Sequence, residues 1–447
     1  MKDLKFRDDL YADVRVERRF TTKITYLNGD VKEMNELDVT RAFLRVFDGN
    51  MWYYSSTTDV GDLQTELDSL CAFAKPNPKI SENPVVRAFE VNKDKKIIFA
   101  DDCVDKIPLS DKAKLISDVL PVIKGDYVNV VTGVYLDRYS RFNFKSSKGA
   151  DIEYDYQTSG YSFIVQFADK DNNFRNNFAD CKTFFKDLVI DPEKVKDFLK
   201  ESENFLLHAK PLEKAGVYPV ILSPIVTGVF AHESFGHKSE ADFMLGDEAM
   251  KREWTIGKKV GSDILSIVDE GGVFGSGYTP YDDEGTKCSE TYLIKNGVLT
   301  GRLHSISTAA ELGEKPTGNA RAVDCDFEPI VRMTTTHVKS GSSTFDELVK
   351  GIKHGYFIKN VSHGSGMSTF TIAPTICYEI VDGKIGDPVK IAVITGDVFK
   401  TLSLVDGLSK EYEILCFVTG GCGKMEQYPL PVGLGGPYMR VKEMGVQ

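Results

Sequence analysis

The sequence lacks a run of apolar residues long enough to cross a membrane. Its most apolar stretch, residues 217–231, contains Pro219 and Pro224 and is shorter than the roughly 20 residues that a membrane helix needs. Residues 1–20 are crowded with charge and contain no apolar segment of the kind found in signal peptides. We therefore expect a protein without membrane contact, located in the cytoplasm.

The chain also has a deficit of positive charge. Its 447 residues include 55 lysines and arginines against 66 aspartates and glutamates, so the net charge is −11 at pH 7. Proteins that bind the phosphate backbone usually carry a net positive charge or a basic stripe, and the sequence shows neither. We expect no direct contact with nucleic acid.

No two of the eight cysteines have the two-residue spacing of a zinc knuckle or a redox motif. A chain of this length does not need disulfides to fold, and mostly free thiols are typical of a reducing compartment. Apolar residues make up 42% and charged residues 27%, which excludes a wholly disordered chain and a disulfide-rich miniprotein. At about 150 residues per domain, the length predicts two or three domains.

The two parts of the chain differ in their patterns of apolar residues. Residues 1–210 alternate strand-like segments, such as 14–26 and 42–54, with helix-like segments, and end in a predicted helix at 191–210. Residues 211–447 contain mainly short strands separated by glycine turns. We predict an α+β fold, with an N-terminal α/β domain over 1–210 and a mainly antiparallel β domain over 211–447.

The C-terminal part contains the segment with the strongest chemical signal. Ser223 followed by Pro224 predicts the start of a helix, because serine caps a helix and proline fits its first turn. The helix then carries the pattern His-Glu-x-x-x-His, formed by His232, Glu233 and His237. In the zinc-peptidase helix motif the histidines are four residues apart, so that both side chains lie on one face. The pattern therefore suggests a metal-binding helix with one additional residue.

The five-residue spacing of His232 and His237 requires a local distortion if both are to bind one ion. At about 100° per residue, roughly 140° separates them in a regular α-helix. A π-bulge of one residue would return them to one face, and Gly236 offers a place for it. We predict a helix from residue 224 to about 243 with a bulge between the histidines. The alternative is a buried helix whose histidines are hydrogen-bonded in the core, and the spacing alone leaves both open.

A catalytic zinc ion needs three protein ligands and an open position, so a third ligand has to be found. Glu240 lies three residues after His237 and is the local candidate, and Asp242 is less well placed. The distant candidate is Cys422, which follows an apolar strand and has glycine on both sides. A thiolate is a good soft ligand for zinc, although a lone cysteine in a glycine turn more often has a structural role.

In these segments the chain resembles the TldD/PmbA metallopeptidases, once called modulators of DNA gyrase. The resemblance is carried by residues 232–243 and 421–424, and it extends to three further blocks, at 281–286, 315–321 and 329–334. The family contains a catalytic type with the zinc motif and a partner type without it. Because this chain carries the motif, it is similar to the catalytic TldD type.

The resemblance implies a peptidase whose zinc ion (Zn²⁺) is held by His232, His237 and Cys422, with Glu233 as the general base. Unfolded or small peptides would bind in extended conformation as an added strand, by main-chain pairing. The family also implies an assembly of two subunits, either a homodimer or a heterodimer with a zinc-free paralogue.

The same resemblance moves Glu240 and Asp242 out of the ligand set to positions beside it, where a carboxylate accepts the second ring N–H of a ligand histidine. One segment departs from the family, because residues 361–367 read Val-Ser-His-Gly-Ser-Gly-Met in place of a Gly-Gly-Gln-Val-Asp run. This departure affects the expected contacts with the substrate strand, and we interpret His363 as a loop residue. The candidates for stabilising an oxyanion are Tyr428, Asn319, Arg321 and His363.

Two other functions remain as alternatives. The chain could be a non-catalytic partner or scaffold subunit of a peptidase assembly, and the complete zinc motif argues against this. It could be a regulator of DNA gyrase, as the older family name suggests. The net charge of −11 argues against direct DNA binding in that role.

Overall fold

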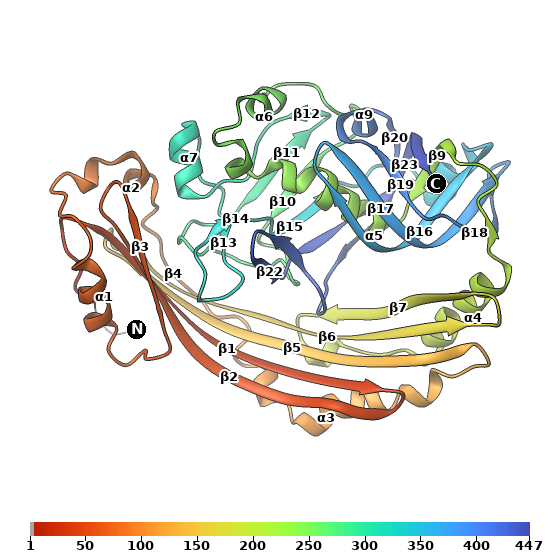
Figure 1. Cartoon of the computed structure of the whole chain (residues 1–447), viewed down its shortest axis with the longest axis horizontal. Coiled ribbons are helices and arrows are strands. Elements are labelled where there is room, and N and C mark those ends of the chain that lie inside the picture. The colour runs from red at the N-terminus through yellow and green to blue at the C-terminus, as the bar shows by residue number, and fades with distance from the viewer. Residues whose placement is uncertain (1–3) are drawn as a thin grey trace.

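The protein, described over residues 4–447 by a computed structural model, contains two large β-sheets. Long curved strands of the N-terminal half form the lower layer in Figure 1, and the C-terminal half lies above their concave side. Most strand pairs in both sheets are antiparallel, and helices accompany both. The predicted α+β fold is confirmed.

The N-terminal sheet is built around four long strands. Its order is β3 (Trp52–Thr57), β2 (Asp30–Phe47), β1 (Tyr11–Leu27), β5 (Val128–Ser146), β6 (Asp151–Ala168) and β4 (Lys93–Lys96), with β7 (Asn173–Lys182) also paired to β6. The hairpin between β1 and β2 turns at Asn28 and Gly29, whose φ values of 51° and 91° suit a tight turn. The expected alternation of strands and helices therefore gives a sheet that is antiparallel except for the pair β4–β6.

The strand predicted at 42–54 is wrong in its extent, because the segment is a hairpin formed by the end of β2 and the start of β3. Between these strands, the Asp48 carboxylate accepts hydrogen bonds from the backbone N–H groups of Asn50 and Met51 at 2.9 and 2.8 Å. A side-chain acceptor of this kind closes a tight turn. The aromatic residues on both sides concealed the turn in the sequence pattern.

Helices cover the ends and the outer side of this sheet (Figure 1). They are α1 (Leu63–Cys71), α2 (Pro84–Ala88), α3 (Leu109–Ser117) and α4 (Pro192–His208). The α4 helix begins as predicted, since the Asp191 side chain accepts a hydrogen bond from the backbone N–H of Glu193. Its buried residues Val195 and Leu199 join the core under β5 and β6.

The C-terminal sheet has twelve strands. Its order is β12 (Val298–Leu299), β11 (Glu290–Lys295), β10 (Ile267–Glu270), β15 (Thr335–Val338), β23 (Gly433–Val446), β9 (Gly216–Leu222), β16 (His354–Gly366), β17 (Thr369–Val381), β18 (Lys384–Lys390) and β8 (Lys210–Pro211). Two more strands, β19 (Ile394–Asp397) and β20 (Val405–Leu415), pair with β23. The central strand β9 leads directly into the helix that carries the histidines.

Shorter elements complete the C-terminal half. They are the two-stranded pairs β13 (Ala320–Arg321) with β14 (Ile330–Val331) and β21 (Cys422–Lys424) with β22 (Gln427–Leu430), and the helices α5 (Pro224–Val229), α6 (Glu248–Glu253), α7 (Ile306–Leu312), α8 (Phe345–Lys350) and α9 (Val398–Ser403). The second sheet begins with β8 at Lys210, close to the predicted boundary at residue 210. The division into two separate domains at that residue stays a prediction.

Six of the eight cysteines are free, in agreement with the expectation of mostly free thiols. The other two, Cys181 and Cys416, form a disulfide that joins β7 of the first sheet to the segment after β20. Between residues 4 and 447, no helix combines the length and the apolar character needed to span a bilayer.

Candidate metal centre

The helix that carries the histidines starts where the sequence predicted. The Ser223 side chain accepts a hydrogen bond from the backbone N–H of Val226, and Pro224 occupies the first turn of α5. At Gly228 the helix lies directly against β23, because a Cβ there would be 2.5 Å from the backbone nitrogen of Gly435. This close approach fixes the start of the helix against the centre of the sheet.

The predicted distortion is present. After Val229 the chain continues as a π-helix, Phe230–Gly236, and the backbone N–H of His237 donates to the carbonyl of His232, five residues earlier. The two imidazole rings consequently lie next to each other in an edge-to-face arrangement, with their centroids 5.1 Å apart. Packing also requires glycine at position 236, since a Cβ there would be 2.1 Å from the Met333 sulfur.

The prediction that one helix continues to residue 243 is wrong. A 3-10 turn, His237–Ser239, ends the helix, and Glu240 has an extended backbone with φ −73° and ψ 116°. Backbone hydrogen bonds between Ser239–Ala241 and Leu303 stabilise this extended segment. A separate 3-10 turn, Ala241–Met244, follows it. The break turns the Glu240 side chain back towards His237.

Cys422 reaches the histidines from the β21–β22 hairpin. The buried Arg332 guanidinium donates to the carbonyl of Cys422 at 2.7 Å and to that of Gln427 at 3.3 Å, so it contacts both strands of the hairpin. Gly421 has a φ of 153°, and a Cβ there would be 2.5 Å from the carbonyl oxygen of Leu430. The glycine before the cysteine therefore allows the hairpin to close.

The structure brings His232, His237 and Cys422 together, with their ligand atoms all within 4.8 Å of one another. The Cys422 Sγ lies 3.4 Å from Nε2 of His237. Tetrahedral zinc with Zn–N near 2.0–2.1 Å and Zn–S near 2.3 Å puts two such ligand atoms about 3.5 Å apart. The spacing therefore has the size of a tetrahedral zinc site.

The hydrogen bonding of the histidines also fits a metal. The Nδ1 atom of His232 is buried and has no hydrogen-bond partner among the described residues, which is costly for a histidine held in the core. The Nδ1 atom of His237 is bound to Glu240 at 3.2 Å, so its Nε2 is the nitrogen that faces the thiol. The alternative of two hydrogen-bonded core histidines would therefore leave one ring nitrogen of His232 without a partner among the described residues.

The charges at the site favour a cation. Burial opposes a charged thiolate, but the two imidazoles outweigh it and hold the pKa of Cys422 well below its usual value. Burial likewise opposes a charged His237, but Cys422 and Glu240 raise its pKa to about 10. Cys422 and Glu240 thus favour a positive charge at His237, and a divalent cation held by the cluster would supply that charge in place of a proton.

Glu240 and Asp242 lie beside the ligands, at different distances from them. Glu240 is fully buried between Nδ1 of His237 and Nζ of Lys424, with contacts of 3.2 and 3.0 Å. Asp242 contacts Lys424 with both carboxylate oxygens at 2.7 Å. Glu240 therefore contacts His237 directly, whereas Asp242 is connected to Glu240 through Lys424.

Glu233 lies next to the cluster without belonging to it. Its side chain is partly exposed and packs against β16, where a Cβ on Gly364 would be 3.0 Å from the Glu233 Cγ. A Cβ on Gly366 would be 3.0 Å from the Glu233 carbonyl oxygen. The absence of a side chain at Gly364 and at Gly366 of β16 thus leaves space for Glu233.

The candidates for stabilising an oxyanion divide into two groups. Asn319 and Arg321 are buried, and they donate hydrogen bonds to Asp269 and to backbone carbonyls elsewhere in the core. Tyr428 is 63% exposed on β22. His363 is exposed too, but it lies in strand β16, so its interpretation as a loop residue is wrong. Only Tyr428 and His363 have side chains open to a substrate.

Two residues that support the site received no role from the sequence. Lys424 joins Glu240 to Asp242, and Arg332 holds the backbone of the Cys422 hairpin. Lys424 is two residues after Cys422, so its closeness in sequence to a candidate ligand could have suggested a role at the site. Arg332 is 90 residues from Cys422, and no spacing rule could have connected them.

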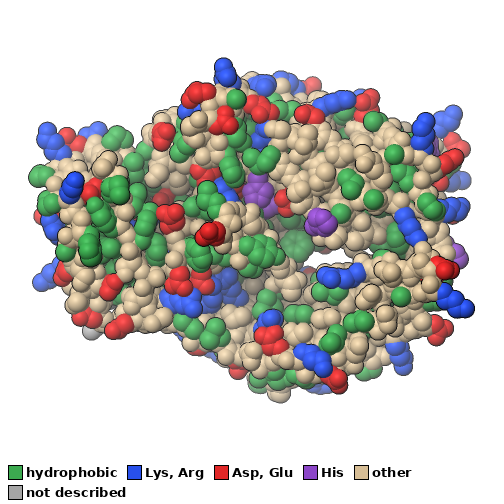
Figure 2. Space-filling view, viewed as in Figure 1, with side chains coloured by type: hydrophobic (Ala, Val, Ile, Leu, Met, Phe, Trp, Pro, Cys, Tyr) green, Lys and Arg blue, Asp and Glu red, His purple; other side chains and the backbone are tan. Residues whose placement is uncertain are grey.

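The space-filling view shows an opening between the two halves of the molecule (Figure 2). In Figure 2 an opening separates the C-terminal half from the curved sheet below, and histidine side chains lie above it. A basic side chain lies on the opposite side of the opening. The concave sheet and the C-terminal half therefore enclose a passage in the middle of the molecule.

The comparisons with known proteins identify metallopeptidases. The family described as PmbA/TldA metallopeptidase matches with its C-terminal domain at residues 215–447 and with its domain 1 at residues 12–75. A protein named metalloprotease from Methanothermobacter thermautotrophicus is 31% identical over 442 residues, covering 97% of this chain and 94% of its own. A protein named zinc metalloprotease TldD homolog from Saccharolobus solfataricus is 28% identical over 447 residues, covering 98% of this chain and 96% of its own.

Solved structures show the same fold. A crystal structure described as a putative modulator of a DNA gyrase from Thermotoga maritima has a TM-score of 0.77 at 18% identity, with 98% of this chain and 96% of that chain covered. TldE from Thermococcus kodakarensis has a TM-score of 0.75 at 14% identity, with coverage of 98% and 96%. These identities support the fold alone, whereas the family match spans the whole C-terminal half and the related metalloprotease nearly the whole chain. This chain therefore belongs to the PmbA/TldD family of metallopeptidases.

Proposed function

We propose that this chain is a zinc-dependent peptidase that hydrolyses unfolded or small peptides bound as an extended strand. The observation that carries the proposal is the convergence of His232, His237 and Cys422 from a π-helix and a distant hairpin, beside Glu233. A zinc ion held by these three residues would supply a Lewis acid for the scissile carbonyl and lower the pKa of a bound water towards about 7.

Glu233 is the general base in this proposal. It follows a ligand directly in the sequence, remains outside the ligand cluster and is partly exposed. Its carboxylate can accept a proton from the attacking water and then donate that proton to the leaving amine. Glu240 has a different task, because its bond to Nδ1 of His237 keeps Nε2 directed towards Cys422.

Strand β16 supports the idea of a substrate bound as an added strand. On one side β16 pairs with β9 only from Tyr356 to Ile358, while on the other it pairs with β17 along nearly its whole length. In the described chain, residues 360–366 therefore have one edge without a strand partner. This edge belongs to the part of β16 whose glycines contact Glu233. Free strand edges are templates for pairing with extended peptides.

The assembly and the location of the protein are further parts of the proposal. A homodimer, or a heterodimer with a zinc-free paralogue, would complete the passage between the two halves of the chain. Light scattering of the purified protein, alone and mixed with such a paralogue, would measure the assembly. The proposed location is the cytoplasm.

A metal analysis combined with a cleavage assay tests the central proposal. We expect about one zinc ion per chain, loss of peptide cleavage after treatment with a chelator, and recovery on adding zinc. A zinc-loaded chain that cleaves no unfolded polypeptide in the presence of its partner would contradict the proposal and support the scaffold alternative. A gel-shift assay at moderate salt examines the gyrase-regulator alternative, for which DNA binding would be required.

Replacing Glu240 with glutamine should reduce turnover by roughly 10- to 100-fold with most of the zinc retained, since the amide is a weaker partner for the ring N–H of His237. Glu314→Gln is a matched control, because Glu314 makes a similar 2.9 Å contact with His304 outside the metal site. Peptide cleavage and metal content measure both variants. Equal activities for the two variants would mean that the His237–Glu240 contact has no special role.

Replacing Gly364 with alanine should lower turnover by about 10- to 100-fold through a displaced Glu233, because misplacing a catalytic group by about 1 Å has effects of that size. The new Cβ would be 3.0 Å from the Glu233 Cγ and 2.9 Å from a Val229 methyl group. Zinc content should stay normal, since no ligand is touched. Gly386→Ala, on the exposed strand β18 with its nearest neighbour at 3.5 Å, is the control and should cleave normally.

A further inference from the structure

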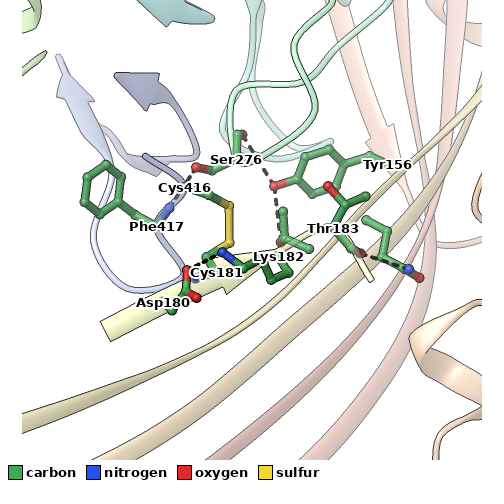
Figure 3. Close-up of a disulfide and its surroundings, with 10 residues drawn as sticks. Tyr156, Asp180, Cys181, Lys182, Thr183, Ser276, Cys416 and Phe417 are labelled. Carbon is green, nitrogen blue, oxygen red and sulfur yellow. Dashed lines mark hydrogen bonds and ion pairs between the residues drawn. A yellow bond between two sulfur atoms is a disulfide. The ribbon is translucent and has the colours of Figure 1, made fainter. Parts of the chain in front are cut away.

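The only disulfide among the described residues lies at a junction between the two halves of the chain. It joins Cys181, at the end of β7 in the N-terminal sheet, to Cys416, 235 residues later, with the two Cα atoms 5.2 Å apart (Figure 3). Cys416 is only six residues before Cys422. The bond therefore attaches the segment that leads to a proposed zinc ligand to the opposite sheet.

Residues 416–421, which lead from Cys416 to Cys422, have few contacts with their surroundings besides the disulfide. The backbone N–H of Phe417 donates to the Ser276 hydroxyl at 2.9 Å. Val418 packs over Gly160 of β6, where a Cβ would be 2.5 Å from a Val418 methyl group. Residues 419–421 are exposed, and two of them are glycines with positive φ. Without the disulfide, the contact of Val418 with Gly160 would remain against the N-terminal sheet, while the hydrogen bond to Ser276 would hold the segment to the C-terminal half.

The other six thiols of the chain are free. That composition is typical of a reducing compartment, in which protein disulfides are usually transient and respond to the redox state. The two bonded residues also differ in exposure, since Cys181 is 5% exposed and Cys416 is partly exposed. A small thiol in solution would therefore meet the Cys416 sulfur first.

We propose that Cys181 and Cys416 form a reversible cross-link that exchanges with low-molecular-weight monothiols and disulfides, and that its state sets the mobility of residues 416–421. The exchange itself is independent of the proposed peptidase function, whereas its effect on the metal centre rests on that function. The intact disulfide restrains the segment that leads to Cys422, and reduction releases this segment from the N-terminal sheet.

The exchange takes place in two balanced steps. The thiolate of a monothiol attacks the Cys416 sulfur, forms a mixed disulfide there, and expels Cys181 as a thiolate that takes a proton from solvent. The thiolate of a second monothiol then attacks the outer sulfur of the mixed disulfide and expels Cys416. The protein disulfide gains two electrons, and two monothiols become one disulfide. The reverse reaction needs the oxidised monothiol and closes the bond.

The zinc-loaded protein equilibrated in glutathione buffers of graded redox poise tests the first half of the proposal. Trapping of free thiols followed by mass analysis should show Cys181 and Cys416 converting together, while the other six cysteines keep a constant state. If the pair stays bonded at every poise, the bond is a permanent structural link. If it stays reduced at every poise, the cross-link does not exist in solution. Either result overturns the proposal.

Amide hydrogen exchange tests the second half and does not depend on peptidase activity. Opening the bond should speed exchange at residues 416–421 by at least about tenfold, while strand β5 keeps its rate. Cys181→Ser should exchange fast in every buffer, and it leaves the segment itself unchanged; Cys416→Ser serves if the first variant fails to fold. Equal exchange in the two redox states would refute the proposal.

Two further measurements separate this proposal from the proposed function. The oxidised protein should transfer zinc to a chelator several-fold more slowly than the reduced protein. A redox-dependent exchange rate in a protein that cleaves no peptide would leave the cross-link standing and reject the peptidase. A protein that cleaves peptides, but whose zinc transfer and amide exchange rates do not change with the redox buffer, would support the peptidase and reject the proposed cross-link.

Discussion

Replacing Glu233 with alanine is expected to reduce peptide turnover by about 10²–10⁴-fold while zinc stays bound, because the change removes a general base and no metal ligand. The two readouts are the initial rate on an unfolded polypeptide and the zinc content of the same preparation. Glu233→Gln should be impaired to a similar degree, since an amide has the shape of the carboxylate but cannot take up the proton.

Glu311→Ala serves as the matched control for this variant, because Glu311 is an exposed glutamate on α7. It should cleave like the parent. The assay has to include the normal partner subunit, so that a missing partner is not mistaken for a missing base. If Glu233→Ala cleaves as fast as the parent under these conditions, the hydrolytic mechanism is wrong and the scaffold alternative takes its place.

Replacing Cys422 with serine is expected to remove zinc and activity together. A hydroxyl is a far poorer zinc ligand than a thiolate, and the remaining two histidines do not complete a catalytic site. The two imidazoles hold the pKa of Cys422 well below its usual value, and this favours the thiolate form that a metal requires. Elemental analysis and the cleavage assay on one preparation measure both losses.

Cys325→Ser is the control for the cysteine change. Cys325 is also buried, and its Sγ contacts the carbonyl oxygens of Arg15 and Arg41, away from the metal site. It should keep zinc and activity. A Cys422→Ser protein that holds a full equivalent of zinc would show that the third ligand lies elsewhere, with Glu240 as the nearest carboxylate.

The parts of the fold that could be predicted depend on local signals. The cap at Ser223, the turn at Asn28 and the start of α4 each result from a few neighbouring residues, and the structure has them where expected. The turn at Asp48 was missed because a side-chain hydrogen bond, and not a glycine or proline, closes it. The end of the metal helix was missed because contacts with Leu303, far along the chain, extend the backbone at Glu240.

The site was predictable to a similar degree. The π-helix followed from helix geometry once His232 and His237 were required to share a face. The choice of Cys422 over Glu240 came from a family resemblance, since residue types alone left both open. Arg332 could not be found at all, because its role is a hydrogen bond to a backbone carbonyl, and backbone acceptors are the same at every position of a sequence.

The origin of the ligands has a consequence for how the protein acquires its metal. His237 and Cys422 are 185 residues apart, and the strands β15, β16, β17 and β20 all lie between them in the chain. The complete ligand set therefore exists only when almost the entire C-terminal sheet has formed, and its long-range pairings are the slow events of folding. In the proposed function, zinc would bind the finished fold and not a partly folded chain, so its binding free energy would stabilise the sheet as a whole. Metal content would then measure completed folding, and a damaged or incomplete C-terminal half would have no site for the metal.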